Sequence, residues 1–171
     1  MNSGRHFEIE RKYLIRFPDI PTLQAQEGVE QWEIVQIYLK ASGPNETRRI
    51  RQVVSDGAIR YYKTFKRHLT DITNVEEEGE IDQLEYIRLS KEMQPGCKPL
   101  GKTRYRIPYE GHVLELDVYP FWQDRAILEI ELEREDEDAA IPGYVHIIRD
   151  VSDDMAYRNR QLAEKVVYEE I

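Results

Sequence analysis

Apolar and polar residues alternate with a period of two through most of the chain, which is typical of β-strands that bury one face. Short groups of turn residues separate the alternating runs, among them Ser55-Asp56-Gly57 and Glu110-Gly111. Gaps this short favour antiparallel hairpins. The pattern predicts eight strands, at residues 6–16, 33–41, 46–55, 58–67, 72–81, 101–109, 112–119 and 125–134.

Two segments have a helical pattern instead. Asp82 can cap a helix over residues 83–93, and Ser152 can cap a longer helix over residues 153–168, because short polar side chains accept hydrogen bonds from the first turn. A short helix can also follow Pro18. We expect these helices to cover the outside or the ends of the sheet.

Eight antiparallel strands in so small a chain favour a closed barrel, because closure removes exposed sheet edges. The 171 residues suit one domain with its own core, and we find no repeat, linker or low-complexity tract. We therefore predict a single domain over residues 1–171.

Ionisable side chains share one face of each predicted strand, and their charges are segregated by strand. The acidic strands carry Glu76, Glu78, Glu115, Asp117, Glu129 and Glu131, the basic strands carry Arg49, Arg51, Lys66, Lys102 and Arg104, and the first strand carries Glu8, Glu10 and Lys12. The alternative is an ordinary sheet whose ionisable face is solvated. Such a face usually mixes both signs, so the segregation favours a barrel with an ionisable interior.

An ionisable interior is costly unless each charge finds a partner. Clustered carboxylates raise one another's pKa and bind a proton or a hard divalent cation. Arginine and lysine suit the oxygens of a polyphosphate. Together they indicate a metal-dependent phosphoryl-transfer site. A glycosidase could use Glu8 and Glu129 as its carboxylate pair, but that chemistry does not explain six converging cations.

Composition narrows the partners and the cellular compartment that we expect for this protein. The net charge of −9 argues against a nucleic-acid partner. The single cysteine, Cys97, excludes an internal disulfide and favours a reducing compartment. We find neither a signal peptide nor an apolar run long enough to span a membrane. We expect a cytoplasmic protein with no membrane partner.

Several other residues have simpler interpretations. The four histidines, including His68, lack metal-ligand spacing, so we expect surface or satisfied core positions. Trp32 is interpreted as a packing residue. We expect Tyr157 to pack, and Arg158 and Arg160 to be solvated rather than to reach inward.

The segment Glu8-Ile-Glu-Arg-Lys12 resembles the Glu-x-Glu-x-Lys signature of the CYTH superfamily, also called triphosphate tunnel metalloenzymes. The resemblance continues in order through Gln36–Leu39, Arg49-Ile-Arg51, Tyr61–Lys66, Glu76-x-Glu78, Lys102–Tyr105, Glu115-Leu-Asp117, Glu129-Ile-Glu131 and Val151–Tyr157. It implies an α+β, mainly β fold: an eight-stranded antiparallel β-barrel tunnel with flanking helices, including a C-terminal helix. It also implies a triphosphate bound at the centre of the tunnel, with Mg2+ or Mn2+ as cofactor.

The resemblance also assigns roles to residues. Phosphates would be held by Lys12, Arg49, Arg51, Lys66, Lys102 and Arg104. Metal would be held by Glu8, Glu10, Glu129 and Glu131. The tunnel would also be lined by Glu76, Glu78, Glu115 and Asp117, which would complete the metal shell or orient the bases. The predicted catalytic residues are Lys12, Glu8, Glu10 and Lys66. Asn74 departs from the family, whose members often carry a basic residue there.

The function that we predict is hydrolysis of the terminal phosphate of a triphosphate, with inorganic tripolyphosphate favoured over thiamine triphosphate or ATP. One alternative is a CYTH-type adenylate cyclase, which would release pyrophosphate. Another is a non-catalytic polyphosphate or nucleotide sensor. We expect a monomer or a homodimer.

Overall fold

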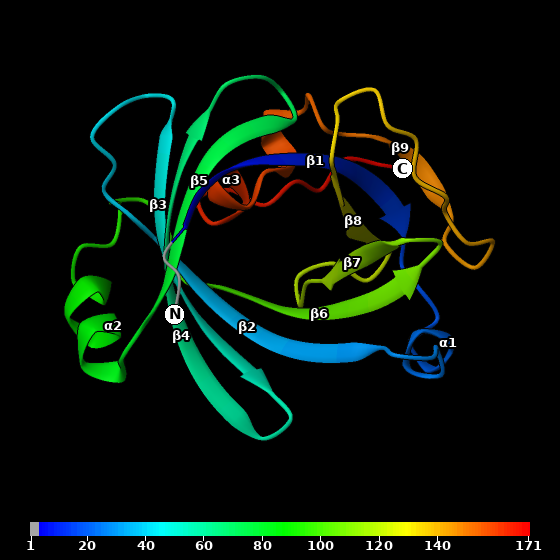
Figure 1. Cartoon of the computed structure of the whole chain (residues 1–171), viewed down its shortest axis with the longest axis horizontal. Helices are drawn as coiled ribbons and strands as arrows, with labels where there is room; N and C mark the ends of the chain where they lie inside the picture. Colours follow the sequence, from blue (N-terminus) through cyan, green and yellow to red (C-terminus); the bar gives the residue numbers. More distant parts are fainter. Residues whose placement is uncertain (1–3) are drawn as a thin grey trace.

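The computed structural model describes residues 4–171, which fold into one sheet with short helices around it (Figure 1). The strands are β1 (Gly4–Arg16), β2 (Glu30–Leu39), β3 (Glu46–Ser55), β4 (Ala58–His68), β5 (Thr73–Ile81), β6 (Leu100–Tyr109), β7 (His112–Val118), β8 (Arg125–Leu132) and β9 (Ile147–Asp150). The helices are α1 (Ile20–Gln24), α2 (Gln83–Ser90), a 3-10 turn η1 (Met155–Tyr157) and α3 (Asn159–Leu162). The eight predicted strands all form, each within a few residues of its predicted bounds.

The sheet closes into a barrel. Its strand order is β5-β4-β3-β2-β6-β7-β8-β1, and β1 then pairs with β5, for example Phe7 with Val75. Every pairing is antiparallel. The ninth strand, which the sequence did not predict, adds to the C-terminal half of β1, where Tyr13 faces Asp150. The predicted eight-stranded antiparallel barrel is confirmed.

Apolar residues pack on the outside of the barrel and also fill one end of its interior. Outside, one cluster covers β1 and β6 to β8 under α1, and another lies between β2, β3 and α2. Inside, Leu14, Tyr38 and Ile127 pack with Trp122 and Tyr157. They share the inward face with charged residues because side chains repeat every second position along a strand. The charged residues therefore occupy only part of the interior.

Two helix predictions are confirmed. The helix after Pro18 is α1, whose cap Asp19 accepts a hydrogen bond from Thr22 N. The helix after Asp82 is α2, which ends at Ser90 rather than at residue 93. Within residues 4–171, no helix combines the length and apolar character needed to cross a membrane.

The prediction of one long helix over residues 153–168 is wrong, because only η1 and the four-residue α3 form there. Ser152 is not a helix cap: its hydroxyl accepts a hydrogen bond from Lys12 N at 2.9 Å. Arg158 has extended backbone angles (φ −72°, ψ 140°), which separate the two short helices. After α3, the indole of Trp122 donates to Val167 O, and this contact holds the tail in a non-helical course.

Changing Asp82 to Ala is expected to lower the Tm by about 2–4 °C. The carboxylate of Asp82 accepts a hydrogen bond from Glu85 N at 2.8 Å and starts the helix that covers the cluster between β2 and β3. Thermal unfolding followed by circular dichroism measures the change. Asp136→Ala is the control, because exposed Asp136 pairs only with Arg134; an equal shift in both variants would contradict a capping role.

Candidate active site

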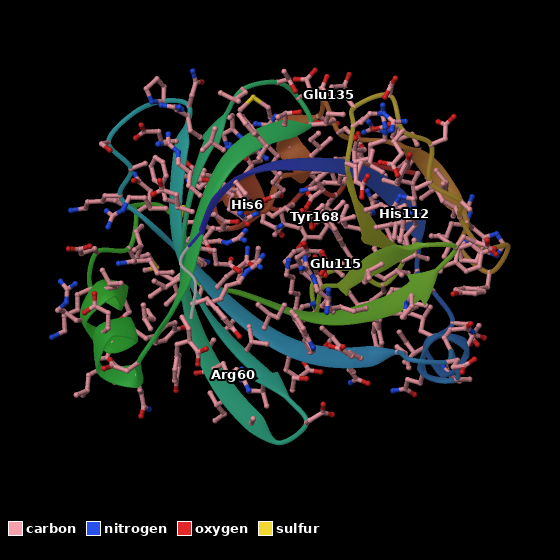
Figure 2. The ribbon with its side chains drawn as sticks, in the orientation of Figure 1. His6, Arg60, His112, Glu115, Glu135 and Tyr168 are labelled. Atoms are coloured by element: carbon pink, nitrogen blue, oxygen red, sulfur yellow. The ribbon has the colours of Figure 1, made fainter. Side chains whose placement is uncertain are left out.

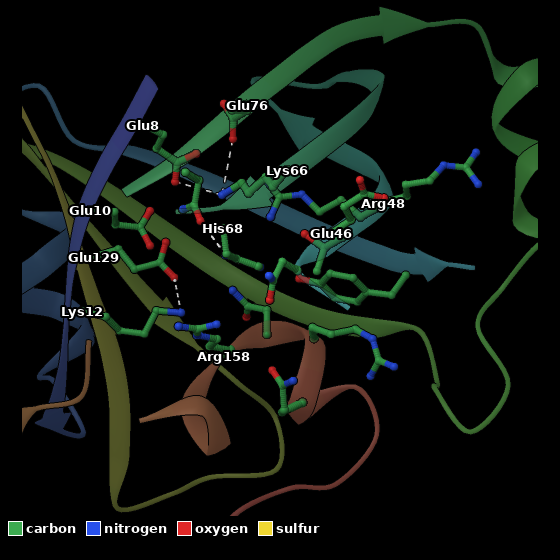
Figure 3. A pocket seen from close by; sticks show the side chains of 18 of the residues that line it. Glu8, Glu10, Lys12, Glu46, Arg48, Lys66, His68, Glu76, Glu129 and Arg158 are labelled. Atoms are coloured by element: carbon green, nitrogen blue, oxygen red, sulfur yellow. Dashed lines mark hydrogen bonds and ion pairs between the residues drawn. The ribbon is translucent and has the colours of Figure 1, made fainter. Parts of the chain in front are cut away.

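A cavity of about 810 Å3 runs through the barrel interior and is lined mainly by charged side chains (Figure 3). Figure 2 shows Glu115 inside the ring of strands and Arg60 outside it. All but two of the predicted site residues line this cavity, namely Glu8, Glu10, Lys12, Arg49, Arg51, Lys66, Glu76, Glu78, Arg104, Glu115, Glu129 and Glu131. The two exceptions are Lys102 and Asp117.

Lys66 joins two carboxylates from neighbouring strands. Its Nζ lies 2.9 Å from Glu8 Oε1 and 3.4 Å from Glu76 Oε2. Burial alone would raise the pKa of Glu8, but the ammonium of Lys66 holds that pKa well below its ordinary value. Burial and a hydrogen bond with Glu8 raise the pKa of Glu76 to about 8. Lys66 thus favours the ionised form of Glu8, whereas burial beside Glu8 favours the protonated form of Glu76.

Glu129 is the centre of a second group. Its Oε1 lies 3.4 Å from Lys12 Nζ, and its Oε2 accepts a hydrogen bond from Arg104 at 3.1 Å. Burial opposes ionisation of Glu129, but the charges of Lys12 and Arg104 hold its pKa well below the ordinary value. Burial and the charges of Glu129 and Glu8 raise the pKa of Glu10. The nearby cations do not fully compensate the carboxylates in this part of the cavity.

This excess of carboxylate oxygens fits a hard divalent cation. Glu129 Oε1 is buried and accepts no hydrogen bond within residues 4–171, and Glu10 lies beside it in the cavity. In the same part of the chain, no three acidic, histidine or cysteine side chains converge as a complete metal-binding set. Mg2+ or Mn2+ would then be held by one or two carboxylates, with water and substrate oxygens supplying the remaining ligands. Glu131, the last predicted ligand, is solvent-exposed at the rim.

The opposite wall presents two arginines whose donors are only partly used. Arg51 donates from Nε to Gln36 Oε1 at 2.9 Å. Arg49 Nε is buried without a hydrogen-bond acceptor within residues 4–171, and the nearest carboxylate oxygen, on Glu78, is 4.0 Å from Arg49 Nη2. Burial and the charge of Arg49 lower the pKa of Arg51. Both guanidinium groups have donors free for an anion.

Lys102 and Asp117 lie beneath the cavity surface, because the side chains of both are fully buried. Asp117 accepts hydrogen bonds from Lys102 Nζ at 2.7 Å and from Arg104 Nε and Nη2 at 2.7 and 2.9 Å. Burial lowers the pKa of Lys102 to about 7, whereas the charges of Arg104 and Lys102 lower the pKa of Asp117 against burial. A separation of 2.7 Å favours the ion pair. Lys102 does not reach the cavity. It donates a hydrogen bond to Asp117, whose carboxylate in turn orients Arg104.

The contribution of the C-terminal segment to the cavity was not predicted from the sequence. Arg158 and Arg160 line the cavity, although the sequence favoured solvated positions for both. His68 also lines it and is hydrogen-bonded to Asn74. An available signal was the alternation between Tyr157 and Arg158, because Tyr157 is buried among apolar residues and the next residue, Arg158, lines the cavity.

The opposite end of the cavity carries an aromatic ring. Trp32 is half-buried there, and the guanidinium carbon of Arg106 lies 4.6 Å from its ring centroid. Besides the predicted packing, the ring of Trp32 therefore contacts the guanidinium group of Arg106 and lines the cavity.

No protein-family model matches the sequence. No curated protein matches either. Among solved structures, an inorganic triphosphatase matches with 27% sequence identity and a TM-score of 0.56, over 93% of this chain and 95% of that chain. The chain is similar to a triphosphatase along nearly its whole length.

Two more distant structures show the same fold. A conserved hypothetical protein from Pyrococcus furiosus is 23% identical, with a TM-score of 0.58 over 75% of this chain and 80% of that chain. A putative adenylate cyclase from Bacillus halodurans is 19% identical, with a TM-score of 0.50 over 77% of this chain and 83% of that chain. Their identities are too low to carry more than the architecture.

Proposed function

We propose that this chain is a metal-dependent triphosphatase of the CYTH superfamily, and that it cleaves the terminal phosphate from inorganic tripolyphosphate inside the barrel. The observation that carries the proposal is the division of the cavity wall. Arg49 and Arg51 offer free donors, while Glu129 Oε1, which faces Lys12 at 3.4 Å, accepts no hydrogen bond within residues 4–171 in the same cavity. A polyphosphate bridged to a divalent cation matches both kinds of group. The similarity to an inorganic triphosphatase supports the same function.

In this proposal each wall of the cavity has a separate task. Arg49, Arg51 and Arg104 bind the phosphate oxygens and stabilise the charge that develops on them during transfer. Glu10 and Glu129 would hold Mg2+ or Mn2+, which would supply Lewis-acid polarisation of the phosphoryl group when bound, while Glu8 holds Lys66. No protein nucleophile is needed.

The two cavity lysines position the reacting groups. Lys66 is fixed by Glu8, and Lys12 lies against Glu129, so each presents an ammonium at a defined place on the wall. They orient the attacking water and the terminal phosphoryl group. Water adds to the terminal phosphorus, the phosphoanhydride bond breaks, and orthophosphate and pyrophosphate are the products of tripolyphosphate.

Product identification tests this function. The purified protein is incubated with Mg2+ or Mn2+ and, in parallel, with tripolyphosphate, thiamine triphosphate and ATP. We expect orthophosphate chiefly from tripolyphosphate, and complete loss of turnover when a chelator removes the metal. Cyclic AMP and pyrophosphate from ATP would contradict the proposal in favour of a cyclase. Tight binding without any product would indicate a sensor.

A further inference from the structure

Arg158 is a cation in the cavity without an acidic partner. Figure 3 shows it reaching from the C-terminal segment into the cavity. Its neighbour Arg160 pairs with Glu164 at 3.0 Å, whereas Arg158 makes no side-chain ion pair or hydrogen bond within residues 4–171. A cation that lines the same partly buried cavity as Lys12 and Lys66, with no acidic partner of its own, is unfavourable unless an anion joins it.

Three segments meet around Arg158 at one end of the cavity, at residues 43–47, 68–72 and 158–161. His68 N donates to Asn45 O at 2.8 Å, which joins the first two segments. Burial and then the positive charge of Arg158 lower the pKa of His68, so the third segment lies close to the second. We call these three segments the C-terminal mouth.

The backbone on both sides of Arg158 is fixed. Before it, the hydroxyl of Tyr157 donates to Glu169 Oε1 at 2.6 Å and accepts from Arg125 Nη1 at 3.2 Å. After it, buried Asn159 accepts a hydrogen bond from the hydroxyl of Tyr119. Tyr157 is buried and held by Glu169 and Arg125, and Arg158 has extended backbone angles, so the side chain of Arg158 lies on the other side of the segment from Tyr157 and lines the cavity.

We infer that Arg158 forms an anion subsite at the C-terminal mouth, and that this subsite binds the phosphoryl group at one end of the polyphosphate. The inference rests on the proposed function and adds to it a phosphate contact from outside the barrel strands. A guanidinium suits this task because its planar donors can bind two phosphate oxygens at once.

Substrate binding and docking of the C-terminal segment are then coupled. The anion contacts Arg158 only while Tyr157 and Asn159 are anchored, so the ligand stabilises the docked segment, and the docked segment tightens ligand binding by the same factor. Amide exchange in residues 152–163 should slow when tripolyphosphate binds.

The test compares the wild type with Arg158→Gln, Arg158→Lys and the control Lys165→Gln. Lys165 is exposed, lies in the same part of the chain and gives the same change of charge. Titration calorimetry with tripolyphosphate in metal-free buffer measures Kd, steady-state kinetics with Mg2+ separate KM from kcat, and thermal unfolding checks the fold. Hydrogen exchange follows residues 152–163.

We expect Arg158→Gln to weaken binding by roughly 10- to 100-fold, which is the effect of losing hydrogen bonds from a charged donor. The change should appear in Kd and KM more than in kcat, with Tm and Lys165→Gln unchanged. Arg158→Lys, which keeps the charge without the planar donors, should bind with intermediate affinity. Slower exchange of residues 152–163 on adding ligand should be lost in Arg158→Gln.

Three outcomes would overturn the inference, and they are distinguishable. If the wild type binds tripolyphosphate and Arg158→Gln binds it within twofold of the wild type, the subsite is wrong and the proposed function stands. If the wild type neither binds nor hydrolyses tripolyphosphate, both are wrong. Should Arg158→Gln fold poorly, an unchanged Kd for Arg158→Lys together with ligand-independent exchange of residues 152–163 would overturn the subsite.

Discussion

Glu129→Gln is expected to reduce kcat/KM for tripolyphosphate by about 10²- to 10³-fold, the usual effect of removing one charge-stabilising group from an active site. The substitution removes the carboxylate that contacts both Lys12 and Arg104, and it removes the buried oxygen that has no hydrogen-bond partner in the described chain. Steady-state phosphate release measures the loss, and titration with Mn2+ should show weaker metal binding.

The control for this prediction is Glu133→Gln. Glu133 is exposed beyond the end of β8, so the same chemical change is made outside the cavity. We expect turnover and Mn2+ affinity of the control to match the wild type. Full activity in Glu129→Gln would remove its assigned role.

Asp117→Asn is expected to destabilise the fold by about 3–5 kcal/mol, because it leaves Lys102 as a buried cation without a compensating carboxylate and weakens two charged hydrogen bonds of Arg104. The expected fall in Tm is on the order of 10 °C. Urea unfolding and calorimetry measure the change, and ligand-free protein separates it from any effect on catalysis.

A double variant distinguishes the cost of an uncompensated buried charge from the cost of losing the hydrogen bonds of Asp117. Lys102→Met with Asp117→Leu removes both buried charges and keeps apolar volume, so it should be less destabilised than Asp117→Asn alone. Equal destabilisation of the two variants would show that the hydrogen bonds of Asp117, rather than the uncompensated charge, dominate.

The strands were predictable because apolar and polar residues alternate with a period of two in each of them. Segregated charges also predicted an ionisable interior, since Arg49 and Arg51 share a face opposite Ile50, which is buried outside the barrel. Alternation fixes the face of a residue but not its depth. For that reason Lys102 and Arg104 look equivalent in sequence, yet only Arg104 reaches the cavity.

The C-terminal region was the least predictable part because its structure depends on distant residues. Asp153 and Asp154 favour a helix start, but Ser152 bonds to β1 and Trp122 binds the tail. The four-residue β9 is too short to show a period of two, and it forms only by adding to β1. The inward direction of Arg158 follows from those contacts and not from local preference.

The closure of the barrel by β1 sets the order in which the chain can assemble. β1 takes β8 and β9, which follow it far along the chain, as partners, and Lys12 N donates to Ser152 Oγ across 140 positions of sequence. Contacts of such long range carry a large loop-closure entropy and are associated with folding in milliseconds to seconds. Lys12 meets Glu129 only when β8 has joined β1. A growing chain therefore cannot bring Lys12 and Glu129 together until β8 has left the ribosome, so this part of the cavity wall forms late.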